Sequence, residues 1–202
     1  MNTMRRVQKI VTAPTAYPVT LATAKSHMRI TFDDDDTIIG VYIGAATALC
    51  EQILQRKLIT QTWKMYLDYW PEIITTLFGD LQSVTHVKYT DIDETQTTLS
   101  NTKYDVDTNS VPGRILLVDG EVWPTDTLNA TNPIEIQFVT GYGANASYIP
   151  DDIRNAVLLT AAHFYETRES ILISDIKLMT VEQIPWTAST LLQNHRVWEW
   201  IL

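Results

Sequence analysis

Hydrophobic residues recur at steps of three and four over residues 33–55, which is the pattern of one face of a long helix. A shorter stretch at residues 20–28 has the same pattern, and Thr20 can cap its first turn. The helical period disappears near residue 58 and returns at Pro150. The pattern therefore predicts two helices, a long region of another kind, and then further helices.

Apolar and polar residues alternate in the intervening region, as they do in strands that bury one face. The alternation is clearest over residues 63–67, and turn sequences such as Pro112-Gly113 and Asp119-Gly120 separate the stretches. Further strands are expected over residues 84–90, 97–99, 103–106, 114–118 and 134–140.

The helical pattern that returns at Pro150 is expected to end near residue 169, and residues 185–194 predict a last short helix. The segment between these two helices, residues 171–183, has an ambiguous pattern, and a loop is one interpretation of it. The simplest construction is an α+β fold: a helical bundle with an antiparallel β module inserted between the second and third helices. The expected domains are a helical connector domain (12–57 with 144–197), the inserted β module (58–143) and a C-terminal docking tail (198–202).

The charge balance limits the kinds of partner that the chain can have. Its 202 residues carry a formal net charge of −9, which argues against a primary nucleic-acid binder and against docking on an anionic membrane. No stretch is expected to be apolar enough to span a membrane. The single cysteine, Cys50, excludes an internal disulfide and fits synthesis in a reducing cytoplasm.

The only basic cluster near a chain end consists of Arg5, Arg6 and Lys9. A flexible, solvated terminus is the favoured interpretation. A contact with DNA or with an acidic neighbour stays open as the alternative.

Four consecutive carboxylates, at residues 33–36, are the strongest candidate for a metal site, because hard cations such as Mg²⁺ and Ca²⁺ prefer oxygen ligands. Consecutive residues on a helix point about 100° apart, so the four side chains cannot all converge on one ion. The favoured interpretation is capping and dipole compensation at a helix start. His163 and Glu166 share a helix face, but the order and partners of a di-metal motif are missing. No metal site is predicted.

Catalytic chemistry finds no support in the sequence. Cys50 lies within the apolar period of the long helix, and the four histidines are scattered. Gly141-Tyr142-Gly143 is too short for a phosphate cradle and lacks a lysine. Neither a catalytic residue nor a cofactor is predicted.

Several short segments occur in a fixed order across residues 12–197. They include PVTLATAKSHMRI at 18–30, LITQTW at 58–63, GRI at 113–115, FVTGYG at 138–143, IPDDIRNA at 149–156 and HFYETRE at 163–169. In this order they resemble the head–tail connector (adaptor, head-completion) proteins of tailed bacteriophages. Residues 70–81 are more apolar than the family pattern, and residues 198–202 extend past it.

The resemblance implies a structural protein of the virion neck that is made in the bacterial host cytoplasm. About twelve copies would form a ring that binds the portal on one side and a tail-proximal connector, stopper or tail protein on the other. DNA would pass through the ring without sequence-specific binding. The helical faces are expected to close the ring, and the candidate interface residues are Gly40, Gly44, Asp151, Arg154, Glu166 and Arg168.

The end of the chain is the expected docking element, because large apolar groups are crowded at a terminus where fraying is normal. In connectors of this kind the C-terminal segment reaches toward the portal. The candidate docking residues are His195, Arg196, Val197, Trp198, Trp200, Ile201 and Leu202. Packing of these residues on the subunit's own core is the alternative.

Two other classes of protein stay open. A monomeric carbohydrate- or protein-binding module would present an exposed aromatic platform on the β region. A metal-dependent hydrolase would bring the carboxylates of residues 33–36 together around an ion.

Overall fold

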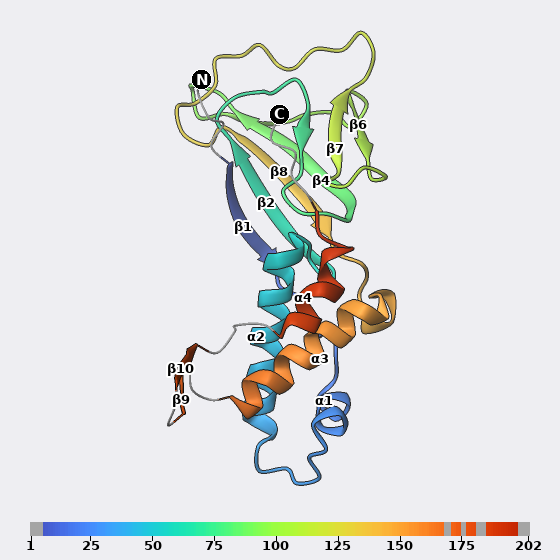
Figure 1. The fold of residues 1–202 in the computed structure, drawn as a ribbon. Coiled ribbons are helices and arrows are strands. Elements are labelled where there is room, and N and C mark those ends of the chain that lie inside the picture. The colour runs from blue at the N-terminus through green and yellow to red at the C-terminus, as the bar shows by residue number, and fades with distance from the viewer. Residues whose placement is uncertain (1–5, 168–170, 175–176, 181–184, 198–202) are drawn as a thin grey trace. The chain divides into compact units, whose positions relative to one another are not determined.

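The computed structural model describes residues 6–167, 171–174, 177–180 and 185–197. In these residues the fold is mixed α+β, with four α-helices and antiparallel sheets, as the sequence predicts (Figure 1). The chain divides into two compact units: a β unit (residues 1–14 and 60–142) and a helical unit (residues 15–59 and 143–202). The strands between α2 and α3 confirm the predicted insertion between the second and third helices.

The helical unit begins with helices whose ends follow local signals. Thr20 Oγ1 accepts a hydrogen bond from the Thr23 backbone N–H at 3.1 Å, so it caps the first helix as predicted. Arg29, with φ 58°, adopts the left-handed conformation that ends this helix. The elements of the unit are α1 (Leu21–Met28), α2 (Asp36–Leu54), the 3-10 helix η1 (Ala146–Tyr148), α3 (Asp151–Glu166), β9 (Ile171–Ser174), β10 (Lys177–Thr180) and α4 (Trp186–Gln193).

The core of the helical unit lies where α2, α3 and α4 pack on one another. Small residues predominate on the buried face of α3, which allows close approach of the helix backbones. Fully buried positions include Ile39, Ile43, Ala46, Cys50 and Leu54 of α2, Ile153, Ala156, Val157 and Ala161 of α3, and Ala188 and Leu192 of α4. The three- and four-residue spacing of these positions is the pattern that predicted the helices.

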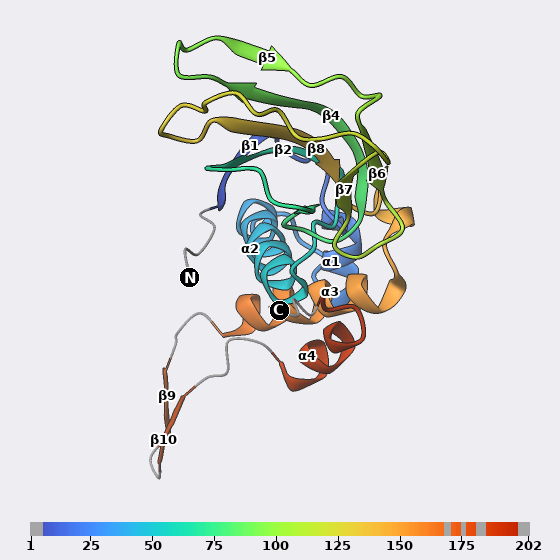
Figure 2. The same cartoon turned by 90° about the horizontal axis from the view of Figure 1, so that it is seen from above.

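The β unit contains two antiparallel sheets. Its strands are β1 (Arg6–Thr12), β2 (Gln61–Leu67), β3 (Ile74–Thr75), β4 (Leu81–Thr90), β5 (Gln96–Thr98), β6 (Tyr104–Asp107), β7 (Arg114–Leu117) and β8 (Ile134–Thr140). Five strands form one sheet in the order β1-β2-β8-β4-β5 (Figure 2). Three strands form the other sheet in the order β3-β7-β6.

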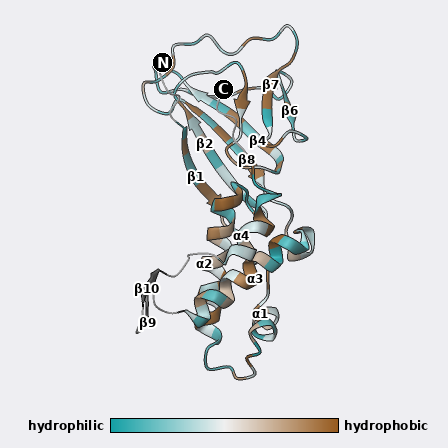
Figure 3. Ribbon diagram, in the orientation of Figure 1, coloured by the Kyte–Doolittle hydropathy of each residue, from teal (hydrophilic) through white to brown (hydrophobic). Residues whose placement is uncertain are grey.

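Alternation along the central strands builds the core of the β unit. In β8, Ile134, Ile136 and Phe138 are buried, whereas the residues between them are only partly buried. In β2, Met65 and Leu67 are buried and Tyr66 between them is only partly buried. Figure 3 shows that the strands of this unit carry both hydrophobic and hydrophilic residues. One apolar cluster includes residues of both sheets: Met65, Leu67, Ile74, Leu81, Val87, Leu99, Tyr104, Ile115, Ile134, Ile136 and Phe138.

The N-terminal strand β1 corrects the expectation of a flexible terminus, which is wrong for residues 6–12. This strand pairs antiparallel with β2, with Arg6 opposite Leu67 and Ile10 opposite Trp63. Most of its residues are exposed, because β1 is an edge strand of the sheet. The exposed side chains explain why hydrophobic patterning did not reveal it.

The segment that follows α3 was ambiguous in the sequence, where a loop was one interpretation. Residues Ile171–Ser174 and Lys177–Thr180 form a two-stranded antiparallel hairpin, with Ser174 opposite Lys177. Four-residue strands are too short to show a clear period in the sequence.

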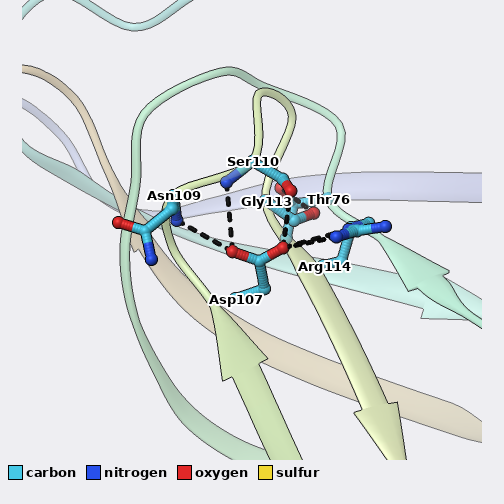
Figure 4. Close-up of polar contacts among 6 residues, drawn as sticks. All are labelled: Thr76, Asp107, Asn109, Ser110, Gly113 and Arg114. Atoms are coloured by element: carbon cyan, nitrogen blue, oxygen red, sulfur yellow. Dashed lines mark hydrogen bonds and ion pairs between the residues drawn. The ribbon is translucent and has the colours of Figure 1, made fainter.

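The turn between β6 and β7 is held by a single carboxylate, that of Asp107 (Figure 4). Its Oδ1 accepts hydrogen bonds from the backbone N–H groups of Asn109 (3.0 Å) and Ser110 (3.1 Å). Its Oδ2 accepts from Ser110 Oγ (2.5 Å) and from Arg114 Nη2 (2.6 Å). These bonds, chiefly those from Ser110 and Arg114, hold the pKa of the Asp107 carboxyl well below its usual value.

Replacing Asp107 by Asn should lower the melting temperature of the protein by a few degrees at pH 7, because the charged acceptor is lost. A carboxyl whose folded pKa is depressed stabilises the fold above its unfolded pKa of 3.8, and this stabilisation disappears as the pH falls toward the folded value. Thermal melts of wild type and Asp107→Asn should therefore differ equally at pH 7 and pH 5, and the difference should shrink progressively as the pH falls below about 4. Asp105→Asn, at an exposed position of the same strand, is the control and should melt like wild type.

Candidate assembly surfaces

Helix α2 presents an exposed face without charges. Opposite its buried face lie the residues that we term the outer stripe of α2: Ile38, Val41, Ala45 and Ala48. Ile38 is 37% exposed and Val41 is 58% exposed. No charged residue occurs in α2 between Asp36 and Glu51. The exposed face of a surface helix is ordinarily polar or charged, so the outer stripe is a candidate contact surface.

The composition of α2 also corrects the expectation that no segment is apolar enough to span a membrane. By length and composition alone, α2 is such a segment, the one found among the described residues. However, its buried face belongs to the core that α2 shares with α3 and α4. Core helices of globular proteins can have the same composition, so this feature is weak evidence for a membrane span.

The two glycines predicted at the ring interface have different surroundings. A Cβ atom on Gly44 would lie 3.3 Å from Tyr17 Oη, so the phenol ring of the same subunit covers this position. A Cβ atom on Gly40 would meet nothing within 4 Å. Only Gly40 therefore leaves open space in the subunit for a neighbour to approach the helix closely.

The acidic cluster of residues 33–36 is held by contacts within the helical unit. Lys25 Nζ lies 2.6 Å from Asp33 Oδ1 and 2.5 Å from Asp36 Oδ1, and these hydrogen bonds raise the pKa of Lys25. Tyr165 donates a hydrogen bond to Asp35 Oδ2 at 2.5 Å. The carboxylates thus connect α2 to α1 and to α3.

Part of the predicted role of this cluster is wrong. Asp35 occupies the N-cap position of α2, but its side chain makes no capping hydrogen bond. Asp36 lies in the first turn, where its negative charge compensates the positive end of the helix dipole, as predicted. Among the described residues, no group of three His, Cys, Asp or Glu side chains is arranged to hold a metal ion.

The N-terminal end of α3 lies beside a shallow hollow. Asp151 and Arg154 form an ion pair with each other and line a cavity of about 310 Å³ together with residues of the segment that leads into α1, including Pro18 and Thr20. Glu166, the last residue of α3, is exposed. Arg168 lies outside the described residues. The ring-interface role of these four residues stays a prediction.

The last described residues are attached to the helical unit. His195 Nε2 lies 2.6 Å from Asp152 Oδ2, and Arg56 Nε donates to the His195 carbonyl at 2.6 Å. The backbone N–H of Val197, which is 8% exposed, donates to the Leu54 carbonyl at 2.9 Å. The chain is therefore anchored up to Val197. Of the other predicted docking residues, Arg196 lies within this anchored stretch, and Trp198, Trp200, Ile201 and Leu202 lie outside the described residues.

Cys50 has the surroundings of a core residue. It is fully buried in α2, and burial raises the pKa of its thiol to about 11. A nucleophilic cysteine needs an accessible thiolate, which these surroundings oppose.

The tryptophans of the β unit mainly serve its core. Trp70 and Trp123 stack on each other with ring centroids 4.7 Å apart and planes at 6°, and Trp63 meets Phe78 edge to face. All three tryptophans are partly buried and pack against the apolar cluster. A carbohydrate-binding platform would require aromatic faces turned to solvent.

Comparison with known proteins gives one family and a group of similar folds. A family model described as "Head completion protein" matches residues 19–198. No curated protein matches the chain in sequence.

Two similar solved structures come from gene transfer agent (GTA) particles. A chain in the neck of an empty GTA particle, computed with C6 symmetry, has a TM-score of 0.77 and 23% identity, with 94% of this chain and 95% of that chain covered. A chain in the neck of a native GTA particle, computed with C12 symmetry, has a TM-score of 0.75 and 23% identity, with 94% of each chain covered. At this identity the likeness supports the fold.

The two glycines of α2 give a matched pair of substitutions. Gly40→Ala should stabilise the subunit by about 0.5–1 kcal/mol, because alanine has the better helix propensity and nothing lies where its methyl group would be. Gly44→Ala should stabilise the subunit less, because the added methyl group must displace the Tyr17 side chain. Urea unfolding of the two variants measures the difference. Equal stabilisation would contradict the role assigned to Tyr17.

Proposed function

Because the chain belongs to the head completion protein family and thus acts as a structural head–tail adaptor, we propose that about twelve copies of it close a head-to-tail ring in the neck of a phage-like particle. The observation that carries this proposal is the family match over residues 19–198. The similar folds, which come from necks computed with C6 and C12 symmetry, support a cyclic arrangement.

The ring binds the portal on one side and a tail-proximal connector, stopper or tail protein on the other. DNA passes through it without sequence-specific contacts. The net charge of −9 supports this role, because an acidic wall repels phosphates and lets DNA slide.

The adaptor role requires no bond-making chemistry, and we infer that the chain is not an enzyme. The surroundings of the most reactive candidates support this inference. The Cys50 thiol is buried with a raised pKa, and the carboxylates of Asp33, Asp35 and Asp36 are engaged by Lys25 and Tyr165.

The two units have separate tasks in this proposal. The helical unit closes the ring through α2 and α3, and the inserted β unit presents its strands outward or toward the tail. We place the domain boundaries at those of the two compact units, within about three residues of the boundaries that the sequence predicted, and β1 belongs to the β unit because it pairs with β2.

The tail at residues 198–202 docks on the portal or on an adjacent subunit. Anchoring of the chain up to Val197 supports this proposal, because it provides a fixed point from which the tryptophan-rich end can extend. His195, Arg196 and Val197 position the tail. Trp198, Trp200, Ile201 and Leu202 supply the apolar contact.

The ring itself is tested by electron microscopy of the full chain mixed with portal rings of its own particle. We expect a second ring of about twelve subunits attached to one face of the portal. The portal alone is the control. A chain that stays monomeric and unattached would contradict the adaptor role.

The tail is tested by removing residues 198–202. This truncation should leave the melting temperature unchanged and abolish binding to the portal in a pull-down. Removing residues 195–202 is the comparison. This longer truncation should lower the free energy of unfolding by about 2 kcal/mol or more. It removes the contacts of His195 with Arg56 and Asp152 and that of Val197 with Leu54. Normal portal binding by the shorter truncation would refute the docking role.

A further inference from the structure

The hairpin of β9 and β10 is rich in apolar residues for so small an element. Its two strands have the sequences Ile-Leu-Ile-Ser and Lys-Leu-Met-Thr, with five large apolar residues in eight. It forms a separate two-stranded sheet, and among the described residues its substantial packing is between its own strands (Figure 1). A two-stranded hairpin is marginally stable alone in water, so this element needs a further layer.

The outer stripe of α2 is also apolar, and its residues are exposed. Ile38, Val41, Ala45 and Ala48 face away from the core, and no charged residue interrupts the helix between Asp36 and Glu51. The stripe is about 15 Å long at 1.5 Å per residue, and a four-residue strand is about 13 Å long. The two elements are thus matched in length.

Charge supports the pairing of these two elements. The only charged residue within the two strands is Lys177, at the turn end of β10, so the strands can cover the neutral stripe without burying an unpaired charge. A membrane is a poorer occupant for the stripe. The four aspartates of residues 33–36 lie at the start of the same helix, and the chain carries a net charge of −9.

We propose that the β9–β10 hairpin of one copy packs on the outer stripe of α2 in the next copy. This inference rests on the proposed ring. A head-to-tail ring requires two different, complementary surfaces on each subunit, and the hairpin and the stripe are two such surfaces. Each copy gives its hairpin to one neighbour and receives a hairpin from the other.

Chemical crosslinking in purified neck complexes tests this contact. One chain carries Val41→Cys and a size tag, and a second, untagged chain carries Leu178→Cys or Met179→Cys. Neighbouring strand residues lie on opposite faces of a sheet, so one of the two hairpin variants should crosslink with a short bismaleimide. Cys50 is buried and does not compete for the reagent.

The expected product is a tagged–untagged pair, and chains that carry both cysteines should give a ladder of oligomers. Val122→Cys is the matched control in place of Val41→Cys, because Val122 is also a strongly exposed valine, at 68%, but lies in the β unit. Absence of the mixed pair, or crosslinks only within single chains, would overturn the proposal.

A charge variant provides an independent measurement. Val41→Asp, at an exposed position, should keep the wild-type melting temperature and reduce incorporation into the neck at least tenfold, whereas Val122→Asp should incorporate normally. Normal incorporation of Val41→Asp would overturn the hairpin contact and leave the ring intact. Flotation of wild type, but not Val41→Asp, with phosphatidylcholine vesicles would instead assign the stripe to a membrane. Absence of the wild-type chain from the neck would overturn the ring together with this contact.

Discussion

The pairing of β2 with β8 is the interaction on which the arrangement of the chain depends. These two strands are the first and last long strands of the insertion, and they pair over seven residues each, from Gln61 opposite Thr140 to Leu67 opposite Ile134. Within the helical unit, Ile59 and Gly143 form a bridge at the two ends of the insertion. An insertion whose ends lie together can be accommodated with little disturbance of the host. The helices can therefore pack on one another although residues 55–150 separate α2 from α3 along the chain.

The polar groups of the chain serve mainly to hold each unit together. In the helical unit, Lys25 joins two aspartates, Tyr165 reaches a third, and His195 pairs with Asp152. In the β unit, burial raises the pKa of Glu135, but hydrogen bonds from Lys64, His86 and Tyr66 outweigh it and lower the pKa overall. These paired groups hold the elements of each unit in place. The same arrangement makes a rigid building block, as an adaptor requires.

Local patterns predicted the elements whose burial alternates within a few residues. The strand over residues 134–140 was predicted with its observed ends, because every second residue is buried and Asn132-Pro133 marks its start. Strand β1 could not be predicted in this way, because its partner lies about fifty residues away and its side chains are mostly exposed. The contacts of Asp35 depend on Tyr165, which is 130 residues distant. The candidate assembly surfaces share this limit: Gly40 and Gly44 look alike in sequence, and only the packing of Tyr17 distinguishes them.

Helix α2 must satisfy two demands, and folding explains only one of them. Its buried face supplies Ile39, Ile43 and Leu54 to the core, which accounts for the helical period. Folding does not require Val41 or Ala45 on the opposite face, because polar residues there would serve the isolated subunit at least as well and would improve its solubility. The absence of charge between Asp36 and Glu51 is thus better explained by a constraint from outside the subunit. In the ring that we propose, a neighbour would impose this constraint at every copy, since a charge placed on the stripe would be buried once per subunit.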